Sequence, residues 1–392
     1  MHWLLGERRL AVAPVAQHLD VPRAPPRRPT KGNTKMNRRC LLGGLLILPA
    51  SHVLVAEPRP LIPAQPDPEK PDWSARRAAM VPLVPSGPIS SRYDGQIIEN
   101  LDIEAQSANG VTVLHQHVTV RNCRIRHAGG FGVSAIDAAG LVLQDLEIDH
   151  VGAPSSGAGP SHERNNVDLN GCPSTTIKRV KASRGSSNIY VRRSEGARLS
   201  LLELYDARGP EPRGQNVQFN RSPNSILEDF SGENGPTSWT EDNVSVFRSD
   251  RCVVRRGLVF YNNSPTGDGV MVEGSFNCIV EDIDAVQQGN GAFAAVPQGD
   301  AGSGGCSFLR CRTCLSYNTK RDGRAAPASK GLSIYTRISA DAQKHTITDC
   351  HYDALANPRN LIWDLRAVNE GWSFTRRAFS PRQPIRLHFG WY

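Results

Sequence analysis

Hydrophobic residues recur along the chain in short segments of regular pattern. One type is eight residues long and occurs in nine copies, from VTVRNCRI at Val118 to HTITDCHY at His345. Its sixth position is mostly apolar or small. Its third position is apolar in every copy: Val120, Leu143, Ile177, Leu201, Leu227, Val254, Val280, Phe308 and Ile347. This pattern predicts short strands with one buried face.

A second type of segment precedes each of these and alternates with period two, as in Val167-Asp-Leu and Val244-Ser-Val. Successive copies lie mostly 22 to 29 residues apart. That spacing is too short for a strand, a crossover helix and a second strand, and no helical periodicity lies between the copies. The repeat therefore predicts a solenoid in which each coil contributes two or three short strands to parallel ladders.

On this repeat, residues 89–370 resemble the right-handed parallel β-helix proteins of the pectate-lyase-like superfamily. The resemblance implies an all-β solenoid of about ten coils. It does not select a function, because this fold is used by lyases, hydrolases, epimerases, phage spikes and adhesins. The aromatic tail, residues 371–392, is expected to cap the last coil or to pack along its side.

The formal net charge of +8 would suit a nucleic-acid partner. Residues 1–56, however, hold nine basic and two acidic side chains, so the remaining 336 residues carry only +1. We therefore expect no nucleic-acid partner. Six prolines between Pro58 and Pro71 predict that residues 57–88 form an extended linker.

The leader, residues 1–56, contains the pattern of an export signal from about Met36. Arg38 and Arg39 precede an apolar run at Leu41–Leu48, and small residues follow. The paired arginines resemble a twin-arginine signal. The apolar run is too short for a permanent membrane helix. We therefore predict a periplasmic or secreted protein without stable membrane insertion after signal cleavage, whose true start is Met36.

The connections between segments differ in length. Long connections at 149–165, 206–215, 231–242, 261–268 and 315–330 should form a wall beside the exposed face of the eight-residue segments, with a groove along it. Outward positions of the central coils are rich in amides, which suit sugar hydroxyls. The alternative is that the repeated asparagines form a purely structural amide ladder. The substrate-binding candidates are Asp168, Tyr190, Arg192, Asn216, Gln218, Asn243, Ser245 and Glu273.

Charged residues on three neighbouring coils are the candidates for catalysis: Arg213, Glu241, Asp242 and Asp268. Asp242 and Asp268 occupy equivalent repeat positions, so their carboxyl groups should lie one coil apart. Two such carboxylates repel each other unless one is protonated, a cation bridges them or an arginine neutralises them. The alternative is that these residues form a salt-bridge network on the surface and have no catalytic role.

Two of these solutions correspond to different activities. A Ca²⁺ ion bound by Asp242 and Asp268 would resemble the calcium site of pectate-type lyases, with Arg213 or Arg192 as the base for β-elimination on a uronate-containing polysaccharide. A protonated carboxyl would instead serve glycoside hydrolysis. The sequence favours the lyase narrowly over the hydrolase, and a non-catalytic glycan-binding or surface protein is the third possibility. The repeated cysteines are expected to be mostly buried free thiols, with at most one bridge such as Cys252 to Cys278.

Overall fold

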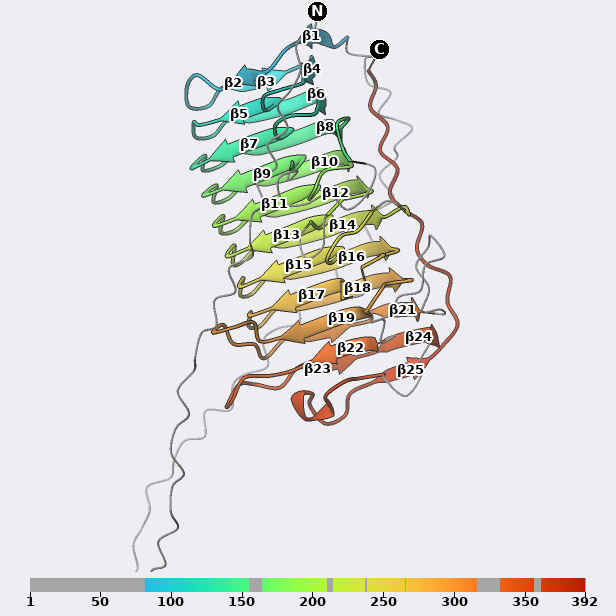
Figure 1. Ribbon diagram of the computed structural model, residues 1–392. Coiled ribbons are helices and arrows are strands. Elements are labelled where there is room, and N and C mark those ends of the chain that lie inside the picture. Colours follow the sequence, from blue (N-terminus) through green and yellow to red (C-terminus); the bar gives the residue numbers. More distant parts are fainter. Residues whose placement is uncertain are drawn as a thin grey trace, which may run out of the picture. The chain divides into compact units, whose positions relative to one another are not determined.

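The strands of the computed structural model wind into a right-handed parallel β-helix of about ten coils, which confirms the predicted fold (Figure 1). The structure describes residues 82–154, 164–209, 214–236, 238–264, 266–315, 332–355 and 361–391. The export signal and most of the predicted linker lie outside these residues. No helix within the described ranges is long and apolar enough to cross a membrane.

The described strands form two parallel sheets, and a short 3-10 helix, η3 (Leu365–Ala367), lies near the end of the chain. The long-strand sheet contains β1 (Val84–Ser86), β3 (Ile97–Glu99), β4 (Leu101–Ala105), β6 (Thr119–His127), β8 (Val142–His150), β10 (Thr176–Ser183), β12 (Arg198–Tyr205), β14 (Ile226–Glu233), β16 (Val253–Phe260), β18 (Ile279–Val286), β20 (Ser307–Leu309), β21 (Arg312–Leu315), β23 (Thr346–Thr348), β24 (Cys350–Leu355) and β25 (Phe374–Arg376). The short-strand sheet contains β2 (Ile89–Ser90), β5 (Val111–Val113), β7 (Val133–Ile136), β9 (Val167–Asn170), β11 (Ile189–Arg192), β13 (Val217–Asn220), β15 (Val244–Phe247), β17 (Asp268–Glu273), β19 (Gly291–Val296) and β22 (Leu332–Thr336). The strand β1 falls inside the predicted linker and pairs with β4, so the sheet begins before residue 89.

Each long strand from β6 to β18 bends at its fourth residue, which gives every coil a third flat side. These residues have left-handed backbone angles, with φ of 52–56° at Asn122, Asp145, Arg179, Leu201, Asp229, Arg256 and Asp282. The ladder of paired residues skips them, as between β10 and β12. The bend corrects one sequence alignment: Leu199, not Leu201, pairs with the buried Ile177.

Apolar residues of both sheets fill the interior, and neighbouring coils adjust their sizes to one another. At the sixth segment position, Phe230 is followed in the next coil by Gly257, where a Cβ atom would come within 2.2 Å of the Phe230 ring. The described cysteines are all free, and Cys252 and Cys278 are buried in the interior without a bridge. This confirms the prediction of free buried thiols.

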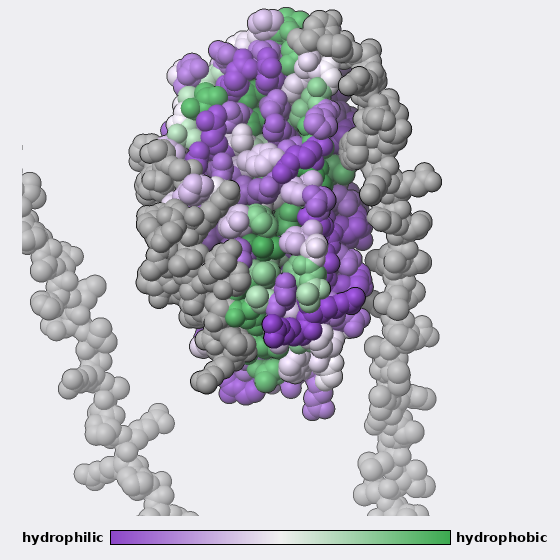
Figure 2. All heavy atoms as spheres, turned by 90° about the vertical axis from the view of Figure 1, so that its right-hand side faces the viewer, coloured by the Kyte–Doolittle hydropathy of each residue, from purple (hydrophilic) through white to green (hydrophobic). Residues whose placement is uncertain are grey.

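The C-terminal tail adds β25 to the end of the sheet and then runs back along the side of the long-strand sheet (Figure 1). Its backbone N–H groups at Arg382, Ile385 and Leu387 donate to Asp284 of β18, Ser231 of β14 and Glu203 of β12, at 2.7, 3.1 and 2.5 Å. Figure 2 views the side of the molecule where the tail runs, and a band of hydrophobic residues is visible in its lower half. The tail therefore both extends the last coil and packs along the side.

The long connections leave the ends of the long strands and enter the short strands, whereas the turns in the other direction are short. The hollow beside these connections lies over the short-strand sheet. The expectation that the groove follows the face of the eight-residue segments is therefore wrong. Those segments form the long-strand sheet, and the tail covers part of their outward face, burying Glu203 and Asp284.

Candidate functional site

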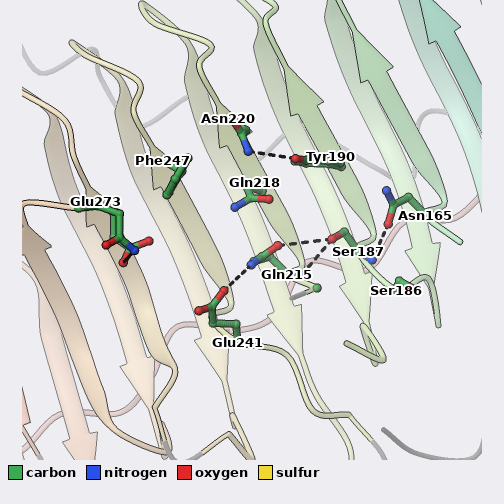
Figure 3. A pocket seen from close by; sticks show the side chains of 12 residues that line it. Asn165, Ser186, Ser187, Tyr190, Gln215, Gln218, Asn220, Glu241, Phe247 and Glu273 are labelled. Atoms are coloured by element: carbon green, nitrogen blue, oxygen red, sulfur yellow. Dashed lines mark hydrogen bonds between the residues drawn. The ribbon is translucent and has the colours of Figure 1, made fainter. Parts of the chain in front are cut away.

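A groove of about 360 Å³ lies over the central short strands. Figure 3 shows that its side chains stand on one face of adjacent strands and on the rim before them. Its lining consists of Asn165, Ser186, Ser187, Tyr190, Gly214, Gln215, Gln218, Asn220, Glu241, Phe247, Glu273 and Gln298. Four predicted site residues are among them: Tyr190, Gln218, Glu241 and Glu273.

Two carboxyl groups, those of Glu241 and Glu273, face this groove from different coils (Figure 3). Glu241 stands on the rim before β15, and its carboxylate accepts a hydrogen bond from Gln215 Nε2 at 3.3 Å. The next coil passes directly beneath, at Gly267, where a Cβ atom would come within 1.4 Å of the Glu241 carbonyl oxygen. Glu273 ends β17 and accepts from Gln298 Nε2 at 3.2 Å. Burial raises the pKa of Glu273, which favours its protonated form.

A hydrogen-bonded series of side chains forms one rim of the groove. Asn165 Oδ1 accepts from the backbone N–H of Ser187 at 2.9 Å, and Ser187 Oγ accepts from that of Gln215 at 3.2 Å. Each bond joins equivalent positions of successive coils. The series fixes the spacing of the polar groups along the rim.

Two aromatic rings and two amides form the floor. Asn220 Nδ2 donates to the Tyr190 hydroxyl at 3.0 Å, and Gln218 Nε2 donates to Ser245 Oγ at 3.3 Å (Figure 3 shows the first pair). Phe247 lies between these amides and Glu273 in the same view. Rings beside hydrogen-bonding amides are suited to sugars, which present both CH faces and hydroxyls.

The predicted carboxyl pair, Asp242 and Asp268, lies below the rim, 1% and 0% exposed. The Asp268 backbone N–H donates to Asp242 Oδ1 at 2.8 Å. Burial, followed by the negative charges of Glu241 and Asp268, holds the pKa of Asp242 well above its usual range. A protonated member is one of the three arrangements in which such a pair can persist.

The same pair is the predicted calcium site. One Asp242 oxygen is already bound by a backbone N–H group. No cluster of three or more His, Cys, Asp or Glu side chains within the described ranges is arranged to hold a metal ion. Calcium therefore stays a prediction, and no chemical step is derived through it.

Two predicted substrate-binding residues, Asn216 and Asn243, do not face outward. Both are fully buried in an amide ladder inside the coil. Asn166, Asn188, Asn216 and Asn243 each donate through Nδ2 to the next amide oxygen, at 2.7–2.8 Å, and the last donates to Gln288. The expected outward orientation of Asn216 and Asn243 is wrong, because they lie at the bend before the strand and not within it.

The remaining predicted residues lie beside the groove. Asp168 is 5% exposed, accepts from Asn165 Nδ2 at 2.7 Å and pairs with Arg192 at 3.5 Å. The Arg192 guanidinium lies 5.7 Å from the centre of the Tyr190 ring. Ser245 is 1% exposed beneath Gln218. Arg213, the fourth catalytic candidate, lies outside the described residues.

Sequence reasoning missed the rim residues Asn165, Ser187 and Gln215. A signal was available, because each directly precedes an asparagine of the ladder in the repeat. It also missed Gln298, which enters from the connection after β19 and has no counterpart in the repeat.

No family model matches the chain, and no curated protein is similar to it in sequence. Among solved structures, the Dettilon tailspike protein is similar at a TM-score of 0.49 and 10% identity, over 75% of this chain and 61% of that one. The catalytic domain of a GH87 α-1,3-glucanase is similar at 0.38 and 12%, over 67% and 56%. A PL6 family alginate lyase is similar at 0.30 and 10%, over 77% and 51%. This chain thus spans about half to three fifths of these proteins, and at such scores the similarity carries no argument about activity.

Proposed function

We propose that the groove is the active site of an exported enzyme that cleaves a polysaccharide by hydrolysis. The observation that carries this proposal is the pair of carboxyl groups, Glu241 and Glu273, in one groove lined by amides and aromatic rings. Glycoside hydrolysis uses two carboxyl groups, one as acid and one as base or nucleophile.

The roles follow from the surroundings of each carboxyl group. Burial raises the pKa of Glu273, so this residue is suited to protonate the oxygen of the leaving sugar. Glu241, held by Gln215, is suited to act as a carboxylate on the other side of the bond, as base or nucleophile. Tyr190 and Phe247 would hold the sugar rings between them.

β-Elimination on a uronate-containing polysaccharide is the second candidate. Its predicted base Arg213 lies outside the described residues, whereas two carboxyl groups of described residues face the groove. We therefore propose hydrolysis first, although the sequence alone favoured the lyase. The lyase stays the second candidate because Arg192, a predicted base for β-elimination, lies next to the Tyr190 ring.

The test is a panel of neutral, amino and uronate polysaccharides incubated with the wild type, Glu241→Gln, Glu273→Gln and the control Glu104→Gln. Glu104 is an exposed carboxylate of the long-strand sheet, paired with Arg126. We expect both groove variants to lose about a hundredfold or more in kcat while the control keeps wild-type turnover. Wild-type turnover by both groove variants would overturn the assignment.

Two further readouts separate the alternatives. An unsaturated product absorbing in the ultraviolet, or activity lost to a chelator and restored by Ca²⁺, would identify a lyase instead of a hydrolase. Retention of a glycan with no turnover on any member of the panel would identify a binding protein.

A further inference from the structure

The face that forms the groove continues toward the N-terminal coils, where a second hollow of about 440 Å³ lies over β2 and β5. Asn109, Thr112, Phe131 and Arg164 are among its lining residues. None of these residues has a part in the proposed cleavage. The hollow is therefore a separate feature that the proposed reaction leaves unexplained.

The row of residues that forms the rim of the groove continues into this hollow at the same repeat position. Asn109 and Phe131 stand two residues before the first residues of β5 and β7, as Asn165 does before β9. Asn109 Oδ1 accepts from the Phe131 backbone N–H at 3.0 Å, which is the same coil-to-coil bond that joins Asn165 to Ser187. Arg164 lines the hollow and its neighbour Asn165 lines the groove, so consecutive residues of the chain contribute to the two cavities.

The outer edge of this part of the face carries exposed apolar side chains. Leu114 directly follows β5 and Ile136 ends β7, and they are 55% and 46% exposed. They stand in line with Asn170, Arg192 and Asn220 of the following coils. Leu114 and Ile136 are therefore accessible for contact with the CH faces of sugar rings.

We propose that this hollow is a distal subsite for the same polysaccharide, in which Phe131 contacts the CH face of a sugar ring and Asn109 and Thr112 bind hydroxyls, while Leu114 and Ile136 extend the contact surface outside the hollow. The inference rests on the proposed function, since the occupant is identified by continuity with the groove. The two cavities together extend from β2 to β17, about 34 Å at the usual strand spacing. A site of this length should bind long chains more tightly than short oligosaccharides.

The test compares chain lengths. The probes are the disaccharide to octasaccharide series of each polysaccharide in the panel, with turnover and binding by calorimetry both measured. The variants are Phe131→Ala and Leu114→Ser, the second chosen because an exposed residue can be changed without disturbing the fold. Leu365→Ser is the matched control. Leu365 is 53% exposed, but it lies at the C-terminal end of the β-helix, far along the chain from this hollow.

We expect each variant to weaken binding and raise KM for the octasaccharide about three- to tenfold, and to leave short oligosaccharides and the control unchanged. Turnover with the wild-type dependence on chain length in both variants would overturn the distal subsite and leave the hydrolase intact. Binding that Phe131→Ala weakens, without turnover by the wild type, would support the subsite and overturn the enzyme. Neither binding nor turnover in the wild type would overturn both.

Discussion

The amide ladder at the corner of the coils offers the sharpest test of how this fold is stabilised. Asn216 accepts one hydrogen bond from Asn188 Nδ2 at 2.7 Å and donates two, to Asn243 Oδ1 at 2.8 Å and Asn234 Oδ1 at 3.2 Å. Replacing Asn216 by alanine removes all three bonds in a site that water does not reach. A buried polar group that loses its partner is destabilising, so the variant should unfold more easily.

The expected loss in the free energy of unfolding depends on which hydrogen-bond partners of Asn216 keep another hydrogen bond. A side-chain hydrogen bond contributes about 0.5–1.5 kcal/mol net, so three contribute about 1.5–4.5 kcal/mol. Asn188 Nδ2 retains its bond to the Tyr205 carbonyl, and Asn243 Oδ1 still accepts from Asn234 Nδ2. The loss should therefore lie in the lower half of that range, at about 2–3 kcal/mol.

Equilibrium unfolding in urea, followed by circular dichroism, measures this difference. The matched control is Asn220→Ala on β13, because Asn220 is partly exposed and bonds to the Tyr190 hydroxyl in the groove. We expect the control to lose about 0.5–1 kcal/mol. If Asn216→Ala unfolds no more easily than Asn220→Ala, the ladder does not stabilise the fold and the reasoning is refuted.

Three further predictions concern Glu273 and the tail. Because burial raises the pKa of Glu273, activity should fall as the pH rises through that pKa, and a profile of kcat/KM with no such alkaline limb would contradict its role as acid. The same raised pKa means that ionising Glu273 costs stability as the pH rises above its unfolded pKa. Glu273→Gln should therefore melt at or above the wild-type temperature at neutral pH, and a lower melting temperature would count against this. A chain ending at Arg377 loses the bonds from Arg382, Ile385 and Leu387 to the long-strand sheet, and its melting temperature should fall by roughly 5–10 °C; an unchanged value would show that the tail is not a stabilising element.

The fold could be predicted from the sequence because each coil repeats one pattern of buried positions. Val120, Leu143 and Ile177 fill the same place in successive coils, and all are fully buried. The prediction slipped by two residues in β12, where leucines at 199, 201, 202 and 204 satisfy either register. The bend at Leu201 decides the register, and a left-handed backbone angle at a leucine has no signature in a hydrophobic pattern.

The site was harder to predict, because the alternation of inward and outward side chains was extended to residues that precede the strands. Counting outward from Val217 and Val244 placed Asn216 and Asn243 on the surface. The chain bends at those residues, and their side chains turn inward to the ladder. The position of the groove was misjudged for a related reason. Strand patterns show which residues face outward, but nothing in them indicated that the C-terminal tail packs on the long-strand sheet.

Departures from the repeat, more than the repeat itself, indicate where the chemistry lies. Asp242 and Asp268 are equivalent in the repeat, and one bonds to the backbone of the other, as Asn165 bonds to the backbone of Ser187. Equivalence of this kind is what a structural ladder requires. Glu241 instead stands where the neighbouring coils have Gly214 and Gly267, and Glu273 stands where they have Phe247 and Val296. A carboxyl group that no neighbouring coil repeats does not belong to a ladder of equivalent residues, which makes such isolated positions the ones to test first for catalysis in a solenoid.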